Sequence, residues 1–227
     1  MDYGNMLGES FNYAKEGVVE KMNRWVMLAI ATIILCIPLT GYIMKIYRGA
    51  KPAPEVDDWG TLFVDGIKLM ILGVIYFIPV IIISVIASAA MVGAVMSGNP
   101  SAVMTGMAGA GVLGLVIIIL EIIIGLILPM AAIRFARTNN FGEAFNFNAI
   151  LAHIGKIGWI NYIIALIIVG IVIGIPVAII YFILIMLMLA LSIIGLLIAA
   201  IVFLIIIPPI AVFQARYLTQ IYDTVAA

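Results

Sequence analysis

Hydrophobic and polar positions divide this chain into long apolar runs separated by short polar segments. Residues 158–213 form a run of 56 without a charged side chain, and residues 69–120 form a second run of 52. A helix needs about 20 apolar residues to cross the ~30 Å hydrocarbon core of a bilayer, so each run is long enough for two crossings. The pattern therefore predicts an all-α, polytopic transmembrane helical bundle.

Charged and helix-breaking residues place the individual spans within this pattern. The predicted transmembrane helices are residues 25–44, 67–97, 107–133, 157–185 and 189–213. The second is longer than a bilayer is thick, so we expect it to tilt or to extend beyond the membrane. No polar residue marks the division within the last run, where a tight turn or a bend can form at Gly170, Gly174, Pro176, Ser192 or Gly195.

Amphipathic segments precede the spans. In residues 1–24, apolar side chains recur at three- and four-residue intervals opposite a polar face, which predicts an N-terminal helix at the membrane interface. The segment before the fourth span has the same character, and Asn140 and Glu143 are spaced as a helix N-cap and its N3 partner. Such helices anchor a protein at a fixed depth, and a sharper hypothesis is that they wedge into the membrane and bend it.

An internal repeat is indicated by these segments. Residues 7–11, 59–63 and 141–145 share an apolar-Gly-x-x-Phe pattern, and each apolar run ends with proline followed by basic residues. Residues 59–137 and 141–216 would then each be a leading helix and a two-helix hairpin, with a truncated first copy. The repeat predicts that all three leading helices lie on one side of the membrane, whereas five full spans put the first on the other side.

Basic residues predict the orientation of the chain. With five spans, eight of the eleven Lys and Arg residues lie on one side, together with the C-terminus, and three lie on the other. The positive-inside rule makes the basic loops and the C-terminus cytoplasmic. If residues 25–44 instead dipped into the membrane and returned, bent at Pro38, all eleven would share one side. Because 20 residues are too few for two spans, we expect five.

The stretch around residues 25–80 carries the most distinctive residues of the chain. It contains Gly41-Tyr42, Arg48, Pro52 and Pro54, followed by Asp57-Asp58-Trp59-Gly60, Phe63 and Asp65-Gly66. This series resembles a family of archaeal multi-span membrane proteins defined by a domain of unknown function. The resemblance implies an archaeal cell-membrane protein with five or six helices, and it carries over no activity and no catalytic residue.

Composition narrows the function classes. With 66% hydrophobic and 10% charged residues, the 227 residues leave too little polar sequence for a separate soluble domain, so we expect a single membrane domain over 1–227. The formal net charge is zero, which argues against nucleic acid as a partner. No spacing of His, Cys or acidic residues predicts a metal site, and none predicts a catalytic site or a bound cofactor.

Glu121 is the one carboxylate in the middle of a predicted span. A charged acidic side chain there costs about 3 kcal/mol on insertion scales, so such residues are functional candidates. Glu121 could be protonated and hydrogen-bonded to Ser84, Ser88, Asn161 or another subunit, or it could bind a proton or cation in transport.

Small residues predict close helix packing. They recur at four-residue intervals in the hairpin regions, a spacing that lets helix backbones approach closely in lipid. These residues are Ala102, Gly106, Ala110, Gly114, Gly170 and Gly174. They fit packing within one chain or contact between subunits.

These observations favour a non-enzymatic integral membrane protein of the cell membrane, with membrane lipids as partners and homo-oligomers expected. Its predicted role is to organise or shape the membrane. One alternative is a transporter or permeation subunit for small solutes or ions that uses Glu121. Another is an accessory subunit of a larger complex with other membrane proteins.

Overall fold

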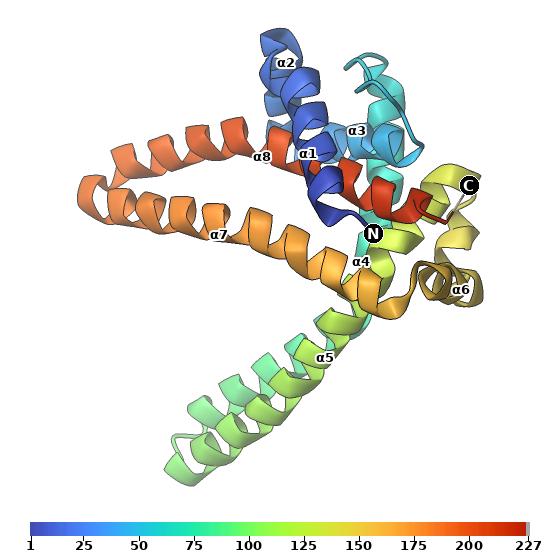
Figure 1. The fold of residues 1–227 in the computed structure, drawn as a ribbon. Coiled ribbons are helices and arrows are strands. Elements are labelled where there is room, and N and C mark those ends of the chain that lie inside the picture. The colour runs from blue at the N-terminus through green and yellow to red at the C-terminus, as the bar shows by residue number, and fades with distance from the viewer. Residues whose placement is uncertain (226–227) are drawn as a thin grey trace. The chain divides into compact units, whose positions relative to one another are not determined.

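Helices make up every regular element of the structure, a computed structural model that describes residues 1–225 (Figure 1). They are α1 (Tyr3–Ala14), the π-helix η1 (Lys15–Val19), α2 (Met22–Ile33), α3 (Ile37–Tyr47), α4 (Trp59–Met96), α5 (Pro100–Thr138), the 3-10 helix η2 (Phe141–Phe145), α6 (Phe147–Ile157), α7 (Trp159–Leu191) and α8 (Ile193–Asp223). The predicted all-α class is confirmed. The chain divides into two compact units, one of residues 1–70 with the residues from 130 onward, and one of residues 71–129.

Four of the described helices are long and apolar enough to cross a membrane: α4, α5, α7 and α8. They agree with the last four predicted spans and identify a multi-pass membrane protein. Helix α4 begins at Trp59, so the segment expected to lead into the second span is continuous with that span.

The predicted span over residues 25–44 is not one helix. Helix α2 ends at Ile33, and α3 begins at Ile37 after a turn in which Leu35 and Cys36 have φ of 51° and 59°. Pro38 explains the break, because its ring would clash with the carbonyl of residue 34 in a continuous helix. With 12 and 11 residues, α2 and α3 are each about 18 Å long or less, which is too short to cross the bilayer.

The last apolar run turns at Ser192, which is one of the positions expected for a turn and lies a few residues beyond the expected end of the fourth span. Ser192 has φ 48° and ψ −117°, and it alone separates α7 from α8. Gly195 makes this turn possible, because a Cβ at that position would lie 2.3 Å from the Leu187 carbonyl oxygen. The two helices therefore leave the turn in backbone contact.

The leading segments are shorter and more divided than the sequence predicts. The N-terminal segment forms α1 and η1, and residues 20 and 21 separate these from α2. Before α7, Asn140 accepts a hydrogen bond from the Gly142 amide at the start of η2, and Asn146 caps α6 through the Ala149 amide at 3.2 Å. The expected cap at Asn140 thus belongs to the 3-10 turn, and Asn146 caps the α-helix.

The first unit is centred on the second half of α8, which contacts α1, α2 and α3 (Figure 1). Tyr42, Phe135 and Tyr217 are among its largest fully buried side chains. The aromatic and aliphatic core of this unit therefore lies near the end of the helices where the charged residues gather.

The second unit consists of the parts of α4 and α5 that form a helical hairpin. Near its turn, a Cβ at Gly106 would lie 2.9 Å from the Ala94 Cβ. Most of its aliphatic side chains point outward, as expected of helices whose solvent is lipid.

Candidate functional site

The family-like residues of the sequence meet where α3 crosses α4. A Cβ added to Gly41 would lie 1.9 Å from the Leu62 carbonyl oxygen, and one added to Gly66 would lie 1.9 Å from that of Ile37. Each glycine therefore faces the backbone of the other helix. The two glycines bring α3 and α4 into direct backbone contact, which side chains at these positions would prevent.

An ion pair closes the same contact. Arg48, just after α3, donates to the Asp65 carboxylate on α4 at 2.5 Å, and the Asp65 side chain is only 5% exposed. Lys68 lies 3.9 Å from the other Asp65 oxygen. Because a buried carboxylate without a partner is costly, Arg48 and Asp65 fix the position of α3 along α4.

The loop between α3 and α4 folds over this crossing. Tyr42, whose pKa is raised by burial, donates its hydroxyl to the Pro54 carbonyl at 2.8 Å. Lys45 binds the exposed Asp57 at 2.6 Å and lowers the pKa of that carboxyl. Asp58 accepts hydrogen bonds from the amide and hydroxyl of Thr61, so it caps α4.

The rest of the family-like series lies in the first turns of α4. Trp59 and Phe63 are partly buried, and Gly60 is exposed beside the Asp58 carboxylate. The whole series is thus a packing and capping arrangement around one helix crossing.

A second ionic cluster connects α1 with α8 and the loop. Glu9 accepts hydrogen bonds from Lys51 at 2.6 Å and Arg216 at 2.5 Å, and these contacts hold the pKa of its carboxyl below the usual range. The Arg216 guanidinium lies 5.3 Å from the ring centre of Tyr13, which donates to the Ala50 carbonyl. Burial raises the pKa of Tyr13 to about 12, so this phenol stays neutral.

Arg24 forms the third cluster, at the edge of a polar cleft. Its guanidinium donates to the Gly17 carbonyl at 2.7 Å and to the Glu55 carboxylate, and the residue is 4% exposed. The cleft has a volume of about 560 Å³, and Glu16, Lys21 and Lys51 are among its lining residues. Its three basic and three acidic side chains balance in charge, which suits an ionic network holding α1, α2 and the loop together.

The described residues contain no group of three or more His, Cys, Asp or Glu that could hold a metal ion. His153 stacks on Tyr222 with ring centres 4.0 Å apart and is hydrogen-bonded to the Tyr222 carbonyl oxygen at 3.0 Å. Burial is the main cause of its lowered pKa. The histidine thus joins α6 to the end of α8.

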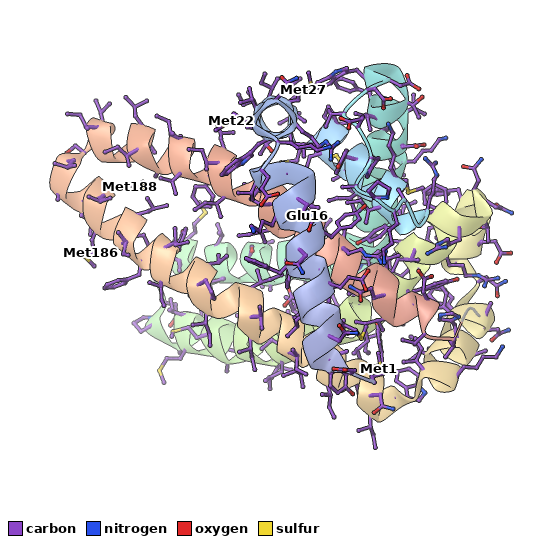
Figure 2. All side chains as sticks on the ribbon, turned by 45° about the horizontal axis from the view of Figure 1, so that its top comes forward. Met1, Glu16, Met22, Met27, Met186 and Met188 are labelled. Atoms are coloured by element: carbon purple, nitrogen blue, oxygen red, sulfur yellow. The ribbon has the colours of Figure 1, made fainter. Side chains whose placement is uncertain are left out.

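Helix α2 shows an apolar stripe on its outer face. Met22, Val26, Ile30 and Ile33 recur at intervals of three or four and are 67%, 49%, 46% and 63% exposed. Its opposite face carries buried residues, including Arg24 and Leu28. Figure 2 shows the side chains of this helix, with Met22 and Met27 labelled. The stripe continues at the turn, where Leu35 is 76% exposed.

Glu121 lies on α5 with its side chain exposed. Ser84 is partly buried and Ser88 is exposed, both on α4. Asn161, on α7, accepts a hydrogen bond from the Tyr3 hydroxyl at 3.3 Å. Ser84, Ser88 and Glu121 thus belong to the second unit, and Asn161 belongs to the first.

The small residues differ in what they face. Ala102, Gly106 and Ala110 are partly buried in the α4–α5 hairpin. A Cβ at Gly114, Gly170 or Gly174 would meet nothing within 4 Å. Only part of the predicted small-residue pattern is thus covered within the described chain.

Sequence reasoning missed Arg24 and Arg216 as buried cations. Both are hidden by contacts between segments far apart in sequence, such as Glu9 with Arg216. A usable signal was their position beside an apolar run, which Arg24 precedes and Arg216 follows, because an arginine there can bury its stem and reach polar groups.

Comparison with known proteins gives one match. The sequence profile of a family described as "Protein of unknown function (DUF4013)" matches residues 25–189. No curated protein and no solved structure matches the chain. The profile covers the α3–α4 crossing and three of the four long apolar helices.

Proposed function

The chain belongs to the DUF4013 family of proteins of unknown function, and from this premise we propose that it is a non-enzymatic protein that organises or shapes the membrane. The observation that carries the proposal is the exposed apolar stripe of α2, a helix whose opposite face holds the buried Arg24 in an ion pair with Glu55. A short helix with one apolar face fits into the boundary between headgroups and hydrocarbon. There it occupies area in one leaflet without crossing the other.

The proposed orientation of the chain in the membrane rests on the break between α2 and α3, which leaves four helices long enough to cross. With four crossings, both termini lie on one side, and all eleven Lys and Arg residues share that side. The positive-inside rule then makes it the cytoplasmic side, which places α1, α2, α3 and α6 at the inner leaflet. The resemblance of residues 25–80 supports an archaeal cell membrane as the location.

Vesicle shape tests this function. We expect the protein, reconstituted into large vesicles, to lower their mean diameter as seen by cryo-electron microscopy. The triple variant Met22→Ser, Val26→Ser and Ile30→Ser should abolish this effect by removing the stripe. The matched control is Ile160→Ser, Ile167→Ser and Ile171→Ser, three exposed positions of α7. Equal loss in both variants, or unchanged vesicles with the native chain, would reject the proposal.

Self-association is a second part of the proposal. Both hairpins expose apolar side chains along their length, and Gly114 and Gly125 leave open space on the α5 face that carries Glu121. A second copy could approach closely there and give Glu121 a hydrogen-bonding partner. Native mass spectrometry in detergent should detect a homo-oligomer, and monomers at all concentrations would contradict this.

Proton- or cation-coupled transport is the competing function, supported by an acidic residue within a membrane helix. Three cavities among the described residues, with volumes of about 330, 460 and 560 Å³, are lined by residues other than Glu121. If the protein shapes the membrane and transports nothing, Glu121→Gln should still reduce vesicle diameter. Vesicles with this variant should also hold a pH gradient. A pH-dependent flux that disappears in Glu121→Gln would instead establish transport. An accessory role would appear as a monomer that is unstable without another membrane protein.

A further inference from the structure

Two hollows lie along the hairpin that α7 and α8 form. One has a volume of about 330 Å³, lies between the two helices, and is lined by Tyr181, Phe203, Gln214 and aliphatic residues. The other has a volume of about 460 Å³ and lies where α1 and η1 meet the hairpin. Ile173 and Ile210 line both hollows, so the two are neighbours.

Prolines lie beside the second hollow. Pro176 of α7 and Pro209 of α8 are both among its lining residues, and each interrupts the hydrogen-bond ladder of a long helix. Figure 1 shows α7 and α8 separating with distance from the turn at Ser192. The hollow thus lies where each helix of the hairpin lacks a backbone N–H.

The lining of this second hollow is apolar with a single exception. Phe11 and Val19 on one side, with Phe213 on the other, present aromatic and aliphatic surface, and Lys15 is the one charged residue of the lining. Lys15 is half exposed and lies 3.2 Å from Glu20. A hydrocarbon surface with a cation at its rim is complementary to a chain that ends in an anionic group.

From these features we propose that the second hollow, a groove between α1, α7 and α8, holds one membrane lipid with an anionic phosphate headgroup. Its hydrocarbon chain lies between α1, α7 and α8, and its phosphate contacts Lys15. The hollow has a volume of about 460 Å³, which suits part of one hydrocarbon chain rather than the whole lipid. This volume falls within the range of roughly 300–1,000 Å³ typical of ligand pockets. This inference is independent of the proposed membrane-shaping function.

Lipid counting by native mass spectrometry tests the site. The full chain is purified in mild detergent and given phosphatidylglycerol or phosphatidylcholine as the probe. We expect one phosphatidylglycerol to stay bound per chain under conditions that remove phosphatidylcholine. Ile173→Trp fills the groove and should lower occupancy about tenfold, equivalent to about 1.4 kcal/mol. The control Ile171→Trp, on an exposed face of the same helix outside the groove, should leave it unchanged.

The headgroup contact has its own test, which does not require a change in the core. Lys15→Ala should lower the preference for phosphatidylglycerol over phosphatidylcholine about fivefold. Lys21→Ala, which removes a similarly exposed cation outside the groove, should not. Loss of all lipid from the native chain, equal effects of both tryptophan variants, or an unchanged preference in Lys15→Ala would each overturn the proposal. So would a change of oligomeric state in Ile173→Trp, which would identify a second copy as the occupant.

Discussion

Trp25 of α2 donates its indole N–H to the main-chain carbonyl of Ile205 in α8 at 2.8 Å. Residue 209 is proline, so it has no N–H to offer the carbonyl four residues before it. In lipid, a carbonyl freed in this way must find another donor. The tryptophan therefore completes α8 and holds the short helix α2 against it.

Replacing Trp25 by phenylalanine should destabilise the protein by about 1–3 kcal/mol, because it leaves the Ile205 carbonyl without this donor. Thermal unfolding in detergent measures the effect. The matched background is Pro209→Ala, which returns an N–H to α8. Trp25→Phe should cost clearly less in that background, and equal costs in both would show that the hydrogen bond does not compensate for the proline.

Gly66→Ala should destabilise the chain by about 3 kcal/mol or more, because its Cβ would overlap the Ile37 carbonyl of α3. Gly73→Ala is the control on the same helix, since a Cβ there meets nothing within 4 Å. That change should be neutral or stabilise by about 0.5–1 kcal/mol. Similar unfolding temperatures for the two variants would contradict the backbone contact between α3 and α4.

Two aspartates with similar ion-pair distances should differ sharply in their contribution. Asp65→Asn leaves Arg48 without its buried partner and should cost about 3 kcal/mol or more. The Asp57 carboxyl, 70% exposed and paired with Lys45, should give a change within about 0.5 kcal/mol on replacement by asparagine. Chemical unfolding curves of both variants decide the point, and equal losses would show that burial does not govern these pairs.

The pH dependence of stability should carry a contribution from His153. Its folded-state pKa is below the ordinary value of 6.5, chiefly because of burial, so the unfolded chain binds the proton more strongly. Stability is then fully present above pH 6.5 and decreases as pH falls through the lower folded pKa.

His153→Phe should remove this part of the pH profile while retaining an aromatic stack on Tyr222. Since the chain has one histidine, its titration can be followed directly by NMR. A folded-state pKa at or above 6.5 would refute the prediction.

Most of the membrane architecture was predictable, because four spans follow from length and hydropathy alone. The first apolar segment was not, since its hydropathy is that of a span and only Pro38 signals the break. The left-handed geometry of Leu35 and Cys36 carries no sequence signature, because such conformations normally favour glycine.

Among the site residues, local contacts were predictable from the sequence and long-range contacts were not. Asp58 precedes a helix at capping distance from Thr61, which a local pattern reveals. The pairing of Glu9 with Arg216 joins positions 207 residues apart, and no periodicity predicts it. Gly41 and Gly66 were visible as family-like residues, but their contact depends on the crossing of α3 and α4.

The turns of the two hairpins are very short. One comprises residues 97–99, and the other is Ser192 alone. In the proposed topology of four crossings, these turns are almost all that the described residues offer to the far side of the bilayer. On this proposal, antibodies, proteases and soluble ligands arriving from the far side would find hardly anything to bind, so recognition would come through the lipid phase or from the side of the basic loops.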